Sequence, residues 1–132
     1  MPRSVVVILA GMLALAGCGS VSDREHGAGE AAQRLLEAAD AGDGDAACAI
    51  LAPDTVAELE ESTGEPCADA VQEAGLPKPA EVESTEVYGQ WAKVVLADDT
   101  VFAAMFPGGW RVVAAGCRPR GERPYDCSIQ GD

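Results

Sequence analysis

Cysteine is the residue type in this 132-residue chain with the widest range of chemistry, since thiols form disulfides, ligate zinc and accept lipid. The five cysteines contain no Cys-x-x-Cys pair, and the single histidine, His26, lies outside the stretch that they span from Cys48 onward. Zinc sites draw on such spacings, so we expect no metal and no cofactor. Disulfides are the favoured alternative and require an oxidising compartment.

The first of the five cysteines, Cys18, directly follows a segment with the features of a secretory signal peptide, residues 1–17. Arg3 supplies a positive start, and residues 5–17 form an apolar run of about thirteen residues, short of the ~20 needed to span a bilayer. The four residues Leu15, Ala16, Gly17 and Cys18 match all positions of a lipobox, and here the chain resembles bacterial prolipoproteins. The alternative is an ordinary secretory signal.

The lipobox resemblance implies cleavage before Cys18, a thioether-linked diacylglyceryl group on its sulfur, and an acyl chain such as palmitate on the new N-terminus. Two or more acyl chains hold a small domain to a membrane stably. We therefore expect the protein at the cell membrane, lipid-anchored on its extracytoplasmic face.

With Cys18 lipidated, Cys48, Cys67, Cys117 and Cys127 remain as an even set for two disulfides. Three pairings are compatible with the sequence. We favour Cys48 with Cys67 and Cys117 with Cys127, because both pairs are local in sequence.

The mature chain would be strongly acidic. It keeps 8 basic and 22 acidic residues among 115, a formal charge of −14, which excludes nucleic acid as a partner. Residues 18–86 hold 17 acidic against 3 basic residues. An anionic bilayer would repel this half of the chain, which favours a domain held off the surface by a tether. Residues 18–29 are polar and contain several glycines, so we expect them to form this flexible tether.

Arginine and alanine usage suggests a high-GC, actinobacterial genome.

The remaining residues, 30–132, predict one α+β domain. Apolar residues at a period of 3.6 indicate helices at 30–41, 46–51, 54–61 and 66–74. From residue 80 the period becomes 2, and strands are expected at 81–88, 91–96, 100–106, 110–115 and 125–130. The expected architecture is therefore N-terminal helices packed on a curved, mainly antiparallel sheet that is apolar on both faces.

This order of elements is similar to the NTF2-like fold, in which a sheet curls into a cone. The chain also resembles a group of small actinobacterial lipoproteins in the stretch 106–117, Phe-Pro-Gly-Gly-Trp-Arg-Val-Val-Ala-Ala-Gly-Cys, and in 124–127, Pro-Tyr-Asp-Cys. The resemblance implies a cone with a pocket inside it. Catalytic NTF2-like proteins place an Asp or His there, whereas Asp98 and Asp99 fall in a predicted turn and no histidine follows residue 29.

Two sets of residues are candidate binding sites. The aromatic residues of the strand region would line the pocket: Tyr88, Trp91, Phe102, Phe106, Trp110 and Tyr125. A proline-stiffened loop between the last two cysteines carries Arg118, Arg120 and Arg123, and is either a solvated loop or a surface that recognises a partner.

These observations predict a non-enzymatic, membrane-anchored lipoprotein that binds a small apolar ligand or an envelope protein partner. One alternative is a cone-fold enzyme of isomerase or hydrolase type, which would need an acid or histidine with convergent donors in its cavity. The other is a structural assembly subunit without a cavity.

Overall fold

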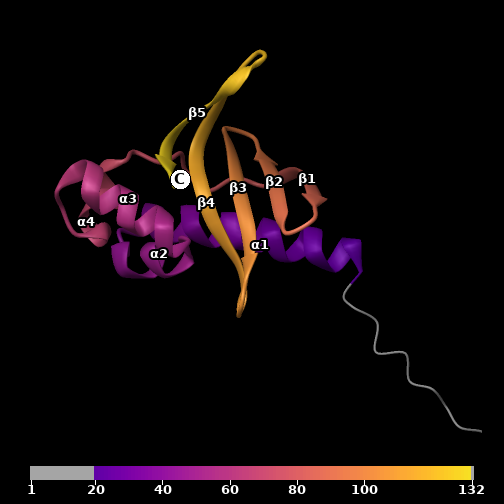
Figure 1. Cartoon of the computed structure of the whole chain (residues 1–132), viewed down its shortest axis with the longest axis horizontal. Coiled ribbons are helices and arrows are strands. Elements are labelled where there is room, and N and C mark those ends of the chain that lie inside the picture. Colours follow the sequence, from indigo (N-terminus) through magenta and orange to yellow (C-terminus); the bar gives the residue numbers. More distant parts are fainter. Residues whose placement is uncertain (1–19, 132) are drawn as a thin grey trace, which may run out of the picture.

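The computed structural model describes residues 20–131, in which four helices precede five strands (Figure 1). The predicted signal peptide and Cys18 lie outside these residues. The elements are α1 (Val21–Asp40), α2 (Gly44–Ile50), α3 (Pro53–Thr63), α4 (Cys67–Glu73), β1 (Val82–Tyr88), β2 (Trp91–Leu96), β3 (Asp99–Phe106), β4 (Gly109–Arg120) and β5 (Arg123–Gln130). The strands form one antiparallel sheet in the order β1-β2-β3-β4-β5, so the predicted α+β class is confirmed.

Helix α1 begins much earlier than predicted, and the expected tether at residues 18–29 is wrong from Val21 onward. The hydroxyl of Ser20 caps the helix by accepting a hydrogen bond from the Asp23 N–H at 3.1 Å. Two of the glycines that suggested flexibility, Gly27 and Gly29, face other residues closely instead: a Cβ on Gly27 would lie 3.0 Å from Cδ1 of Trp110. A small residue there lets α1 approach the sheet closely.

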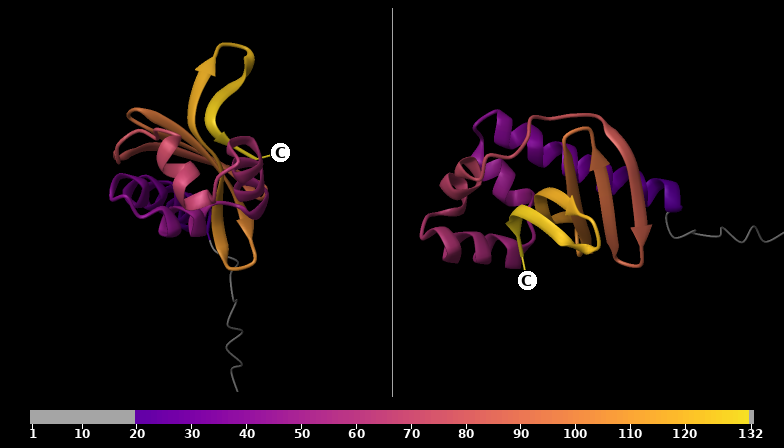
Figure 2. Two further views of the ribbon diagram at one scale, coloured as in Figure 1. Left: turned by 90° about the vertical axis from the view of Figure 1, so that its left-hand side faces the viewer. Right: turned by 90° about the horizontal axis from the view of Figure 1, so that it is seen from above.

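Helix α1 covers one face of the sheet, crossing behind the strands in Figure 1 and lying along one side of them in Figure 2. Leu35 and Leu36 on the helix are fully buried, as are Val94, Val101 and Val112 on the strands. This layer is the main apolar core, and burial of each such side chain contributes about 1.5 to 3 kcal/mol.

Helices α2, α3 and α4 cluster at the C-terminal end of α1 (Figure 1). Helix α2 begins earlier than the predicted residue 46, and its N-cap is Asp43, whose side chain accepts a hydrogen bond from the Ala46 N–H at 3.0 Å. The predicted disulfide between Cys48 and Cys67 is confirmed and ties α2 to the start of α4. The first turn of α3 reaches the sheet face opposite α1 at β4.

The end of the sheet differs from the prediction, because β4 continues to Arg120 and forms a long hairpin with β5 (Figure 2). Arg118, Arg120 and Arg123 therefore lie within strands and not in a loop. Cys117 and Cys127 are directly opposite each other in this hairpin, and their predicted disulfide is confirmed.

Candidate functional site

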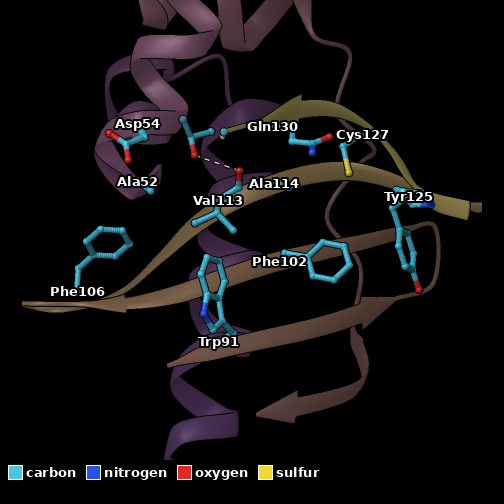
Figure 3. Close-up of a pocket in the computed structure, with 13 residues that line it drawn as sticks. Ala52, Asp54, Trp91, Phe102, Phe106, Val113, Ala114, Tyr125, Cys127 and Gln130 are labelled. Atoms are coloured by element: carbon cyan, nitrogen blue, oxygen red, sulfur yellow. Dashed lines mark hydrogen bonds between the residues drawn. The ribbon is translucent and has the colours of Figure 1, made fainter. Parts of the chain in front are cut away.

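A groove of about 450 Å³ lies on the sheet face opposite α1 (Figure 3). Strands β2 to β5 form its floor, and the first turn of α3 and the residue after β5 form one end. Its lining residues are Ala52, Asp54, Thr55, Trp91, Phe102, Phe106, Val113, Ala114, Pro124, Tyr125, Cys127, Gln130 and Gly131. The volume falls within the ~300 to 1,000 Å³ typical of small-molecule sites.

The aromatic wall of the groove follows from strand alternation and register. Phe102 and Phe106 are both on the same face of β3, and Trp91 on β2 pairs with Ala104 between them. Tyr125 on β5 meets Phe102 edge to face, with ring centroids 5.0 Å apart and planes at 76°. This geometry adds roughly 0.5 to 1.5 kcal/mol beyond burial and holds both rings in place.

The helical end of the groove is held by hydrogen bonds to Val113. The buried hydroxyl of Thr55 donates to the Val113 carbonyl at 3.0 Å, and the Gly131 N–H donates to the same oxygen at 2.9 Å. Next to this pair, the Ala52 N–H donates to the Val112 carbonyl at 2.8 Å. These bonds fasten the start of α3 and the end of the chain to β4.

Four of the six aromatic residues predicted for the pocket line the groove: Trp91, Phe102, Phe106 and Tyr125. Trp110 does not, because it faces α1, where it is buried and the Arg24 guanidinium lies 5.7 Å from its ring centroid. Tyr88 is outside the groove on edge strand β1 and is 52% exposed. Both assignments to the pocket are therefore wrong.

Several lining residues were not predicted, notably Asp54, Thr55 and Gln130. The hydroxyl of Thr55 forms its hydrogen bond with Val113, which is 58 positions away in sequence, so no local pattern could indicate the contact. The sequence marked residue 54 only as a helix start.

The described lining offers a single carboxylate and no basic side chain or histidine. Asp54 is exposed at the rim, and the neighbouring hydroxyl of Thr55 is already donated to Val113. In Figure 3 the Tyr125 hydroxyl points away from Asp54. The other polar side chains of the lining include the amide of Gln130 and the hydroxyls of Thr55 and Tyr125. General acid–base catalysis would need one of these groups and Asp54 within hydrogen-bond reach of the same reacting group.

The buried carboxylate of the domain lies away from the groove. Asp99 accepts hydrogen bonds from the backbone N–H groups of Gly116 and Cys117, at 3.2 and 3.0 Å. Burial raises the pKa of Asp99, and these hydrogen bonds oppose the shift. It has a structural role, fixing the bend at Gly116, where φ is +65°.

The three candidate arginines are exposed on the β4–β5 hairpin, which projects from the rest of the domain (Figure 1). Arg120 donates from Nε to the Pro124 carbonyl at 2.9 Å, and Arg118 is paired in register with Asp126. The hairpin thus presents both signs of charge and not a purely basic surface.

No protein-family model, curated protein or solved structure matches this chain. The resemblance to NTF2-like domains and to actinobacterial lipoproteins therefore stays a prediction. Among residues 20–131, no helix is both long and apolar enough to cross a membrane.

Proposed function

We propose that this protein is a lipid-anchored, extracytoplasmic binding protein whose groove takes a small apolar ligand. The observation that carries the proposal is the aromatic-walled groove of about 450 Å³ on the sheet face that α1 leaves uncovered. Large apolar side chains with few polar groups around a concave surface are typical of ligand sites.

The membrane anchor is proposed from the four lipobox residues that end at Cys18. Diacylglyceryl transfer would form a thioether with the sulfur of Cys18, which alanine lacks. Cys18→Ala should therefore move the protein from the membrane fraction to the medium, or block its processing. A Cys18→Ala protein that stays in the membrane fraction with a cleaved N-terminus would contradict the anchor.

Binding without catalysis is supported by the composition of the groove wall. An enzyme of isomerase or hydrolase type needs an acid or base aligned with a donor, and the groove lining holds one carboxylate, Asp54, and no histidine. A structural subunit without a cavity is disfavoured by the groove itself.

The charge of the lining suggests the chemistry of the ligand. With Asp54 at one end and no basic side chain among the lining residues, an amphiphile with a neutral or cationic head fits better than a fatty acid. The apolar body would lie along Phe102 and Phe106.

Thermal unfolding of the purified full-length protein tests the groove. Ligand at about 100 times its Kd should stabilise the folded state by about 2.7 kcal/mol. We expect a rise in Tm with long-chain alcohols or alkylamines, lost in Phe106→Ala and kept in Tyr88→Ala, which removes an aromatic side chain outside the groove. The proposal fails if no probe raises Tm, or if the two variants respond alike.

A further inference from the structure

Three large apolar side chains are more than half exposed among the described residues, and all three lie at one end of the domain. They are Val21 at 63%, Tyr88 at 52% and Trp91 at 51%. We call these three residues the tip patch. Exposed aromatic residues gathered at one end of a small domain indicate an interaction surface.

The tip patch is held together by a contact between α1 and the β1–β2 turn. Arg24, one helical turn after Val21, donates a hydrogen bond from its guanidinium to the carbonyl of Gly89. Tyr88 and Trp91 flank this turn and are paired directly across the two strands. Figure 1 shows the start of α1 beside the β1–β2 side of the sheet.

The chain that precedes α1 leaves little distance between this end and Cys18. Only Gly19 and Ser20 separate Cys18 from Val21, and three residue steps span at most about 11 Å. A lipid chain on Cys18 would therefore bring the tip patch to the bilayer surface, because the helix leaves no room for the expected tether.

The charge of the domain favours the same orientation. Residues 43–73 form the helical cluster at the C-terminal end of α1, whereas the tip patch lies at its N-terminal end. Because α1 has 20 residues, about 30 Å of helix separates the two ends. Within that range there are no basic residues, and the acidic ones are Asp43, Asp45, Asp54, Glu58, Glu60, Glu61, Glu65, Asp69 and Glu73. The tip-patch end carries Asp23 and Glu25 but also Arg24, so an anionic bilayer would repel the helical cluster more strongly than the tip-patch end.

We propose that the tip patch docks in the headgroup region of the membrane that holds the lipid anchor. The inference rests on the proposed anchor at Cys18. Trp and Tyr prefer this region because each ring has an apolar body and a polar group. Trp91 also lines the groove, so docking would place the aromatic wall of the groove next to the lipid from which an apolar ligand could enter.

Tryptophan quenching in the lipidated full-length protein tests the docking. The chain has two tryptophans, and Trp91→Phe leaves only the buried Trp110 as reporter. The protein is reconstituted into phosphatidylcholine–phosphatidylglycerol vesicles with or without headgroup-level spin-labelled lipid, and flotation measures its attachment. A matched control carries Trp91→Phe with Ala57→Trp, which puts a tryptophan at an exposed site on α3.

We expect spin-labelled lipid to quench the wild-type protein, and this quenching to be lost in Trp91→Phe and to stay absent with Ala57→Trp. Flotation without lipid quenching of Trp91 overturns the docking and leaves the anchor intact. Acrylamide, a quencher in solution, measures the access of water to Trp91 in the same vesicles. If Trp91 is shielded from acrylamide but is not quenched by the lipid, the docking is also overturned and the patch is assigned to a protein contact. Failure to float overturns the anchor and, with it, the docking.

Discussion

The carboxylate of Asp99 accepts a hydrogen bond from the backbone N–H of Cys117 at 3.0 Å, joining the start of β3 to the bent part of β4. Its other oxygen accepts from the Gly116 N–H. A single buried side chain thus satisfies two donors at the point where β4 turns toward the hairpin.

Asp99→Ala should destabilise the domain by about 1 to 3 kcal/mol, because buried N–H groups lose their acceptor. The adjacent Asp98→Ala is the matched control, since Asp98 is exposed and its removal should change the free energy of unfolding by less than about 0.5 kcal/mol. Urea unfolding at neutral pH measures both. Equal losses in the two variants would contradict the role assigned to Asp99.

The pH dependence of stability provides a second test of Asp99. Because burial raises its pKa above the ordinary 3.8, the folded state holds the proton more readily than the unfolded state. The resulting stabilisation is full below about 3.8 and is lost as pH rises through the raised pKa. Wild-type stability should therefore fall over this window relative to Asp99→Asn. Parallel pH profiles of the two proteins would refute the shift.

Helix α1 contains two glycines whose replacement by alanine should differ in effect. A Cβ on Gly29 would lie 3.5 Å from Val82, an ordinary contact, so Gly29→Ala should stabilise by about 0.5 to 1 kcal/mol through helix propensity. At Gly27 the same gain is opposed by the 3.0 Å approach to Trp110. Tm should therefore rise more for Gly29→Ala, and the reverse order would show that α1 packs differently at its start.

The two disulfides should contribute comparably to stability. The cysteines of the first disulfide are 19 positions apart in sequence, and those of the second are 10 positions apart. For loops of this length the chain-entropy model gives a stabilisation of about 3 kcal/mol for each disulfide. The paired variants Cys48→Ser with Cys67→Ser and Cys117→Ser with Cys127→Ser should each lower Tm. Non-reducing peptide mapping of the wild-type protein checks the pairing, and a peptide linking Cys67 to Cys117 would contradict it.

The sequence predicted those parts of the fold whose signals are local. The strand Trp91–Leu96 was predicted with its observed bounds, and its residues alternate between buried and less buried positions. Each disulfide joins cysteines that are near in sequence. The start of α1 was missed because Gly27 is required by contact with Trp110, and such contacts leave no local pattern.

The aromatic wall of the groove was predicted from the aromatic residues of the strands, whereas the β4 residues that line it were not predicted. Along β4 the register with β3 shifts, so that Val112 faces α1 whereas the consecutive residues Val113 and Ala114 both line the groove. A simple period of 2 along β4 would place Ala114 on the same face as Trp110. The helical end, with Asp54, depends on packing between segments far apart in the sequence.

Asp54 should determine which ligand head groups the groove prefers. Ligands of equal chain length with amine, alcohol and carboxylate heads are compared by titration of tryptophan fluorescence. Asp54→Asn should raise the affinity for the carboxylate and lower it for the amine, by about two- to fivefold each, as for charge pairs at an exposed site. The affinity for the alcohol should change little.

The matched control for Asp54 is Glu58→Gln, which removes the same charge from the next turn of α3 outside the groove lining. A long-range field from the acidic helices would make both variants shift the amine and carboxylate affinities equally, and that outcome would exclude a local role for Asp54. A change confined to Asp54→Asn, and weakened at high salt, is expected from a carboxylate at the groove rim.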